Sequence, residues 1–246
     1  MKRETTNRLR VVLEDFFPPL LRDSFLFRWL FRLFWGQHVD ELADFRRRAA
    51  FLTADEYQRL YEKHPRVQDD TDNSHRCIEL IRRDMLGPRI CDVGCGTGYL
   101  LRTLTGNRRG EFEKVVGVDI VPPKAGDGEI EYFSAPVERL PFPDNHFDTV
   151  ICTHVLEHIL DFRAALAELR RIAARRLIVV VPREREYLYT FNPHFHFFPY
   201  VHSFLRFMIP LPEHFECMDV GRDIYYVEDR PAPPAAGSPE HGGADV

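Results

Sequence analysis

Three glycines at alternate positions follow an acidic residue, in the pattern Asp92-x-Gly94-x-Gly96-x-Gly98. They come directly after the apolar run 90–93. Glycine has no Cβ atom, so such a chain can turn tightly and approach a ligand closely. The spacing differs from the Gly-x-Gly-x-x-Gly of dinucleotide-binding proteins, and Asp92 would repel a pyrophosphate. The turn instead suits a ligand that carries an ammonium and a sulfonium.

A second carboxylate follows the next apolar run. Asp119 lies near the end of residues 115–120, about 20 residues after Gly98. In nucleotide-binding βαβ units an acidic residue at this place accepts both hydroxyls of a ribose. Asp119 is therefore predicted to bind the sugar of a nucleoside.

The elements that must position these residues alternate between strand and helix. Short β-branched apolar runs predict buried parallel strands, and amphipathic spacing predicts helices between them. The expected strands are 90–93, 115–120, 149–152 and 177–181, and the expected helices are 99–105 and 162–174. This alternation is typical of a doubly wound α/β sheet. Residues 215–220 and 223–227, separated by Gly221-Arg222, predict a terminal antiparallel hairpin.

The ends of the chain differ from this central part. Residues 1–86 lack strand-like alternation and predict a helical N-terminal cap, in which Thr53 and Glu56 form a capping box for a helix at 53–63. Residues 87–229 form the α/β domain. Residues 230–246 are rich in Pro, Ala and Gly and are expected to be disordered.

The chain resembles the class I S-adenosylmethionine-dependent methyltransferases, in particular the small-molecule enzymes of the ubiquinone/menaquinone-biosynthesis type. Two further stretches carry this resemblance besides the glycine-rich turn and Asp119: residues 138–148, which contain Leu-Pro-Phe-x-Asp, and residues 147–158. The resemblance implies a Rossmann-like, mostly parallel seven-stranded sheet. It also implies S-adenosyl-L-methionine as the cofactor.

The resemblance assigns roles to individual residues. The glycine-rich turn would hold the amino-acid end of the cofactor, and Asp119 its ribose. The expected cofactor-binding residues are Asp92, Gly94, Gly96, Gly98, Asp119, Ile120, Val137 and Thr153. One position departs from the family, because Pro136 stands where an Asp often binds adenine. Adenine is then expected to contact the backbone near Val137, or Ser134.

Composition limits the partners and the location. The chain has 33 Lys and Arg against 38 Asp and Glu, a net charge of −5, so it lacks the basic excess of a nucleic-acid-binding protein. No apolar stretch reaches the roughly 20 residues of a spanning helix. The start has no secretory pattern, and the cysteine count is an odd five. We expect a cytoplasmic protein that acts on a small molecule.

Methyl transfer from a sulfonium is an in-line displacement, and a base is needed only where the acceptor must lose a proton. The candidate bases are His154, His194 and His196. His154 follows the fourth strand, and the other two lie in an aromatic run after the fifth. The alternative for that run is that it packs against a helix beginning near Tyr200.

Residues 154–158 read His-x-x-Glu-His, the reverse of a zinc-protease motif. The methyltransferase resemblance accounts for this stretch, and the spacing reveals no third ligand, so no metal is expected. A nicotinamide dehydrogenase is disfavoured by the glycine spacing and by Asp92. A nucleobase methyltransferase is disfavoured because the fourth strand ends without Asn/Asp-Pro-Pro-Tyr/Phe.

Residues 16–35 are rich in aromatic side chains with a narrow flank of arginines. Three interpretations remain open: packing against the core or a second copy in a homodimer, a lid over an apolar acceptor, or peripheral contact with anionic lipid. The expected function is transfer of a methyl group to a small, apolar molecule, at oxygen, with nitrogen and carbon left open. The alternative is a noncatalytic subunit that binds the cofactor and scaffolds a partner.

Overall fold

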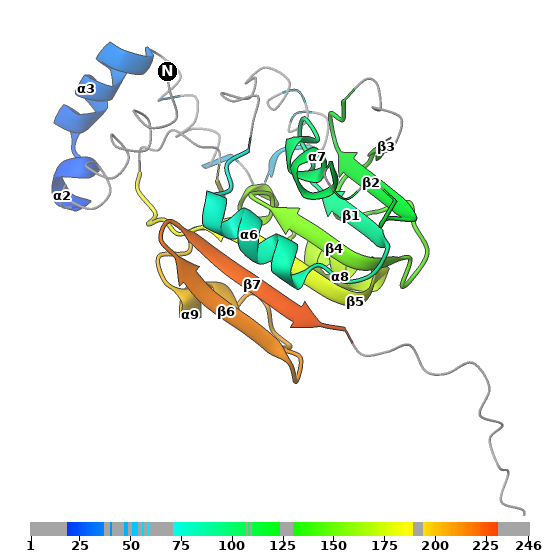
Figure 1. Cartoon of the computed structure of the whole chain (residues 1–246). Helices are drawn as coiled ribbons and strands as arrows, with labels where there is room; N and C mark the ends of the chain where they lie inside the picture. Colours follow the sequence, from blue (N-terminus) through cyan, green and yellow to red (C-terminus); the bar gives the residue numbers. More distant parts are fainter. Residues whose placement is uncertain are drawn as a thin grey trace, which may run out of the picture.

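A mixed seven-stranded sheet forms the centre of the protein (Figure 1). The computed structural model describes residues 19–36, 40, 47–48, 51–53, 56, 59, 71–106, 108, 110–123, 130–188 and 194–230. The strand order is β3-β2-β1-β4-β5-β7-β6, with β3 to β5 parallel and β7 antiparallel to both of its neighbours. The predicted doubly wound, mostly parallel sheet with a terminal hairpin is confirmed.

Strands and helices alternate along the described part of the domain. The strands are β1 (Arg89–Val93), β2 (Lys114–Asp119), β3 (Ile130–Ser134), β4 (Phe147–Thr153), β5 (Ala173–Pro182), β6 (Phe215–Val220) and β7 (Asp223–Asp229). The helices are α2 (Pro19–Arg22), α3 (Phe25–Trp35), α6 (His75–Asp84), α7 (Tyr99–Thr105), η3 (Leu156–His158), α8 (Phe162–Ile172) and α9 (Val201–Leu205).

Two of these boundaries correct the sequence predictions. Helix α8 ends at Ile172, not at residue 174, because residues 173–174 already pair or align with β4 as the start of β5. β5 also includes Arg176, whose charge hid the strand in the sequence and whose side chain donates to Asp229. Strand β3 was not predicted as a run of its own because only Ile130 in it is fully buried.

The core has one layer of side chains on each face of the sheet. Alternate residues of β5 show this: Leu177 and Val179 pack with α8 and α9, whereas Ile178 and Val180 pack with α6 and α7. This is the arrangement expected for strands buried on both faces. Because β1 to β5 run parallel, they all end at the same edge of the sheet, where the loops that follow them can form a site.

Helix α6 begins where Ser74 accepts a hydrogen bond from the N–H of Cys77, and it packs against β5 and β7. It lies inside the range predicted for the N-terminal cap, so the helical layer of the α/β domain starts before residue 87. The Thr53–Glu56 capping box is present. Most of the helix expected at 53–63 and the tail after residue 230 lie outside the described residues. Among the helices that are described, none has the length and apolar character needed to span a bilayer.

Candidate functional site

The glycine-rich turn after β1 has the backbone that its sequence requires. Gly94, Gly96 and Gly98 have φ values of 79°, 60° and 76°, a region that favours glycine. The N–H of Gly94 donates to the carbonyl of Val118 over 2.7 Å, which holds the turn against β2. Gly98 then starts helix α7.

The turn after β1 touches the turn after β4. A Cβ atom on Gly94 would lie 2.0 Å from Cγ2 of Val155, so only glycine fits there. The residue before Val155 is His154, which has a φ of 55°, unusual for a residue with a side chain. His154 is thus held at the edge of the sheet beside the glycine-rich turn.

Asp119 connects two of these loops. Its carboxylate accepts the N–H of Gly96 over 2.9 Å and the N–H of Val121 over 2.9 Å. An ionised carboxylate offers about four acceptor sites, so a carboxylate can accept ribose hydroxyls as well as backbone N–H groups. The geometry fits the role that the family resemblance assigns to Asp119.

Asp92 is buried, with 2% of its surface exposed. Its Oδ1 has no hydrogen-bond partner within the described structure. Burial, with a smaller effect from nearby Asp119, raises the pKa of Asp92 to about 7. A buried carboxylate oxygen without a hydrogen-bond partner is costly unless a cation reaches it. The site therefore fits a ligand with an ammonium group, as S-adenosylmethionine has.

The remaining expected cofactor residues lie along the same edge. Val137 is buried in the core, Ile120 is half-buried, and Thr153 ends β4. The Thr153 hydroxyl accepts a hydrogen bond of 2.9 Å from the side chain of Asn73, a contact that nothing in the sequence indicated. The hydroxyl of Ser134 donates to the Ile120 carbonyl over 3.2 Å.

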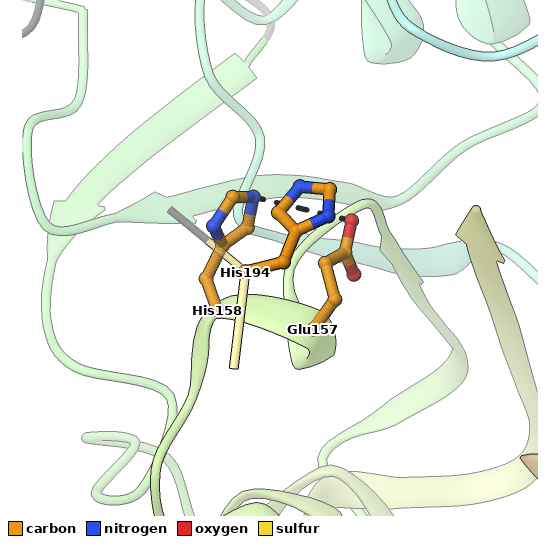
Figure 2. Close-up of side chains that lie close together, drawn as sticks. All are labelled: Glu157, His158 and His194. Atoms are coloured by element: carbon orange, nitrogen blue, oxygen red, sulfur yellow. Dashed lines mark ion pairs between the residues drawn. The ribbon is translucent and has the colours of Figure 1, made fainter. Parts of the chain in front are cut away.

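Two histidines and a glutamate lie close together, as Figure 2 shows. Glu157, His158 and His194 each place a potential ligand atom within 4.8 Å of the others. The Oε1 atom of Glu157 is 3.8 Å from Nδ1 of His154 and 3.9 Å from Nε2 of His158. Nδ1 of His194 makes a hydrogen bond with Oε1 of Glu184.

The three candidate bases do not share one environment. His154 and His194 both belong to the group around Glu157. Nε2 of His196 instead contacts the carbonyl of Ile159 at 2.8 Å, and its ring packs beside Phe162. Burial lowers the pKa of His196.

Sequence reasoning missed Glu184 and Asp223 at this edge. Glu184 lies in the charged run 183–186, which resembles an ordinary solvent-exposed segment, yet it is buried. Oδ1 of Asp223, in the hairpin, is 3.8 Å from Nε2 of His154. No local spacing marks either residue, because each reaches the group from a distant part of the chain.

Residues 91–180 match a family model described as "Methyltransferase domain". The matched residues, which run from β1 into β5, are similar to a methyltransferase domain. The resemblance read from the sequence is confirmed, and S-adenosylmethionine is the cofactor that this match supports.

Among curated proteins, demethylmenaquinone methyltransferase of Thermus thermophilus is 35% identical over 103 residues, or 37% of this chain and 46% of that protein. Ubiquinone/menaquinone biosynthesis C-methyltransferase UbiE of Pseudomonas savastanoi is 35% identical over 97 residues, or 35% of this chain and 38% of that protein. The matched region spans less than half the length of these relatives.

Solved structures also align with the chain. The PH0226 protein of Pyrococcus horikoshii has 18% identity and a TM-score of 0.49, with 72% of this chain and 98% of that one covered. A SAM dependent methyltransferase from Aquifex aeolicus has 16% identity and a TM-score of 0.49, with 73% and 99% covered.

Proposed function

We propose that this protein transfers the methyl group of S-adenosylmethionine to an oxygen atom of a small-molecule acceptor. The contact between Gly94 and Val155 is the observation that carries this proposal. Val155 directly follows His154, which supports a position for His154 beside the glycine-rich turn, where an acceptor hydroxyl would have to lie. The intact glycine-rich turn, Asp92 and Asp119 favour a catalyst over a noncatalytic scaffold.

The residues of the chain have separate tasks in this proposal. Asp92 and the glycine-rich turn hold the amino-acid end of the donor, and Asp119 holds its ribose. The donor is already activated by its positive charge, so the protein acts mainly by alignment and by excluding water.

His154 would accept the proton of the acceptor hydroxyl as the new oxygen–methyl bond forms and the sulfur–methyl bond breaks. Its two ring nitrogens lie 3.8 Å from carboxylate oxygens of Glu157 and Asp223. The ring is thus flanked by two acids at the edge of the sheet where the acceptor would lie.

A second candidate reaction is methylation at a ring carbon of a quinone-type acceptor. It is supported by the relatives, one of which is named a C-methyltransferase of ubiquinone and menaquinone biosynthesis. The proton then leaves from carbon rather than oxygen, and the same histidine can accept it.

The exposed apolar surface of α3 supports an apolar acceptor. Phe27 is buried, whereas Phe25, Trp29 and Leu33 are exposed on this helix. Such a surface beside the catalytic domain fits a lid or a contact with the lipid that carries the acceptor. We therefore propose that the acceptor is apolar.

Calorimetric titration with S-adenosylmethionine tests the cofactor site. Wild type should bind one equivalent, and Asp119→Ala should bind at least about 100-fold more weakly, because two charge-assisted hydrogen bonds contribute about 1.5–3 kcal/mol each. Asp144→Ala removes an exposed carboxylate near Arg171 and is the matched control. Equal affinities in the wild type and Asp119→Ala would contradict the assignment.

A labelled-methyl assay on cell extracts tests the acceptor. Counts should partition into the organic phase if the acceptor is apolar, and counts confined to the aqueous phase would contradict this. Carbon-13 spectra of the labelled product distinguish an oxygen-bound from a carbon-bound methyl group, and thereby decide between the two candidate reactions.

A further inference from the structure

Three metal-ligating side chains meet at the carboxyl edge of the sheet, although two separate segments supply them. Glu157 and His158 come from η3, and His194 comes from the segment after β5. Their potential ligand atoms all lie within 4.8 Å of one another (Figure 2). We propose that Glu157, His158 and His194 bind one divalent first-row transition-metal ion.

The ligand types fit that class of ion. Two imidazoles and one carboxylate suit Zn²⁺, Fe²⁺, Mn²⁺ or Co²⁺, whereas Mg²⁺ and Ca²⁺ prefer oxygen ligands alone. Ligand atoms on one such ion, at about 2.1 Å each, lie roughly 3–3.5 Å apart. The Glu157–His158 separation of 3.9 Å needs only a small side-chain rotation to reach that geometry.

The burial of Glu157 is the second observation that points to a cation. The residue is 1% exposed, and its Oε2 atom has no hydrogen-bond partner in the described structure. A buried carboxylate oxygen without a hydrogen-bond partner is destabilising, and a bound cation removes that cost.

Glu184 supplies the outer contact that metal-binding histidines usually have. It shares a hydrogen bond with Nδ1 of His194, and both residues are buried. In metal sites, a carboxylate at one ring nitrogen fixes the orientation of the imidazole that binds the metal. Glu184 is therefore a positioning residue for His194.

The location suggests what the ion does. His154 lies 3.8 Å from Glu157, and its neighbour Val155 touches the glycine-rich turn. Three protein ligands leave coordination positions open, and an acceptor oxygen bound there would lose its proton more readily. This role rests on the proposed function, whereas binding of the ion does not.

Metal binding can be measured without any methyl acceptor. Full-length protein without a polyhistidine tag would be stripped with a chelator and titrated with Co²⁺, followed by visible absorption and by calorimetry with Zn²⁺. We expect one ion per chain and a rise in the melting temperature. His158→Gln and Glu157→Gln should each bind at least about tenfold more weakly, and Glu184→Gln about 10- to 100-fold more weakly.

His75→Gln is the matched control, because His75 is exposed on α6 and pairs with Glu79 rather than with the cluster. It should bind Co²⁺ like the wild type. His158 is partly exposed, so His158→Gln serves as the test if Glu157→Gln does not fold. The proposal is overturned if the folded wild type binds no ion, or if His158→Gln binds it as tightly.

Activity measurements on the stripped protein test the role of the ion separately from its binding. If this protein binds S-adenosylmethionine but transfers methyl groups only after the ion is restored, both proposals stand. Full activity of the stripped protein would overturn the catalytic role. If the metal-loaded protein does not bind S-adenosylmethionine, the proposed function is overturned and the metal site is not.

Discussion

Buried carboxylates at the two edges of the sheet differ in what surrounds them. Asp84 and Glu228 lie near the edge where the parallel strands begin, and Asp92 and Glu157 lie near the edge where they end. All four are buried. The first two have complete sets of partners, whereas each of the last two has an oxygen without one in the described structure.

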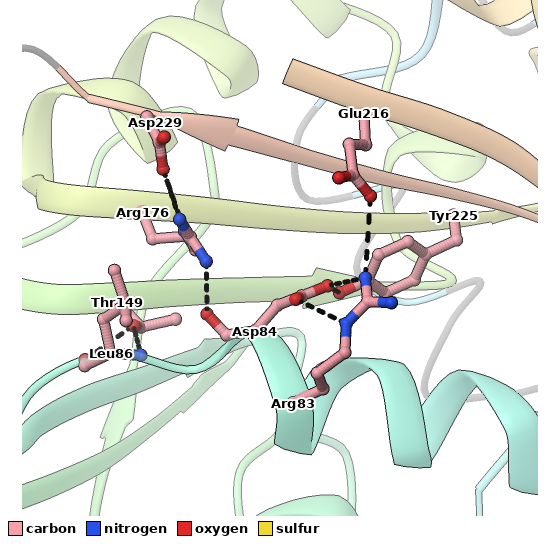
Figure 3. Close-up of polar contacts among 8 residues, drawn as sticks. All are labelled: Arg83, Asp84, Leu86, Thr149, Arg176, Glu216, Tyr225 and Asp229. Carbon is pink, nitrogen blue, oxygen red and sulfur yellow. Dashed lines mark hydrogen bonds and ion pairs between the residues drawn. The ribbon is translucent and has the colours of Figure 1, made fainter. Parts of the chain in front are cut away.

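At the beginning of the strands, each acid is matched by an arginine and a tyrosine. Asp84 accepts hydrogen bonds of 2.8 Å from Arg83 and from the hydroxyl of Tyr225, as Figure 3 shows. Burial alone would raise the pKa of Asp84, but these hydrogen bonds outweigh burial and lower it. Glu228 has the same arrangement with Arg170 and Tyr226.

At the ends of the strands, burial outweighs the other effects. It raises the pKa of Asp92 and of Glu157. The comparison teaches that complete pairing offsets the cost of burying an acid, whereas a buried acid with an open oxygen costs stability until a ligand binds. Strained or unsatisfied groups tend to gather at functional sites for this reason.

The largest expected effect is on stability at the paired edge. Glu228→Ala should lower the free energy of unfolding by about 3–5 kcal/mol, because it leaves the charge of Arg170 and the hydroxyl of Tyr226 without their partner. Urea unfolding measures this. S-adenosylmethionine affinity of the folded variant should not change. Glu111→Ala, at an exposed pair with Arg108, is the control and should cost less than about 1 kcal/mol.

Asp92→Asn is expected to change the free energy of unfolding in the opposite direction, by stabilising the folded protein at high pH. The folded protein holds a proton on Asp92 up to about pH 7, whereas the unfolded chain loses it near its ordinary pKa of 3.8. Stability contributed by this group therefore falls as the pH rises from about 4 through 7. At pH 8 the variant should be more stable than wild type by about 1–3 kcal/mol. A less stable variant at pH 8 would break the comparison.

Cofactor binding should depend on the same proton. The ammonium of S-adenosylmethionine favours ionised Asp92, so affinity should rise about tenfold between pH 6 and pH 7.5. Calorimetry at both values measures the change. Asp92→Asn should bind the cofactor more weakly, with an affinity that no longer changes with pH. If its affinity still rose over this pH range, another group would be responsible for the change.

The smallest expected effect is for Tyr225→Phe. It removes one hydrogen bond to Asp84 and leaves the pairing with Arg83, so the loss should be about 1 kcal/mol. Thermal or urea unfolding would show it. A loss as large as that of Glu228→Ala would mean that the Asp84 group depends mainly on the tyrosine.

Local patterns predicted most of the fold and supplied the residues of the proposed cofactor site. The glycines after β1 could be recognised because positive φ values and close contacts demand that residue type at each position. Asp119 could be recognised from its distance along the chain. Strand β3 was harder, because a half-exposed edge strand leaves a weak apolar signal.

The histidine and glutamate group could not be assembled from spacing. Residues 154–158 were visible as a motif, but His194 and Glu184 join it from beyond β5. No periodic pattern links such distant positions. The burial of Glu184 could not be predicted either, because a charged run usually lies in solvent.

The sequence by itself determined the strand–helix order, the glycine-rich turn and the two acids that follow β1 and β2. These features depend on backbone requirements and apolar periodicity, which act between residues close in the chain. Only the tertiary structure decided which buried acids are paired and which are open. Desolvation and pairing depend on whatever side chains the fold brings alongside, and those come from anywhere in the chain.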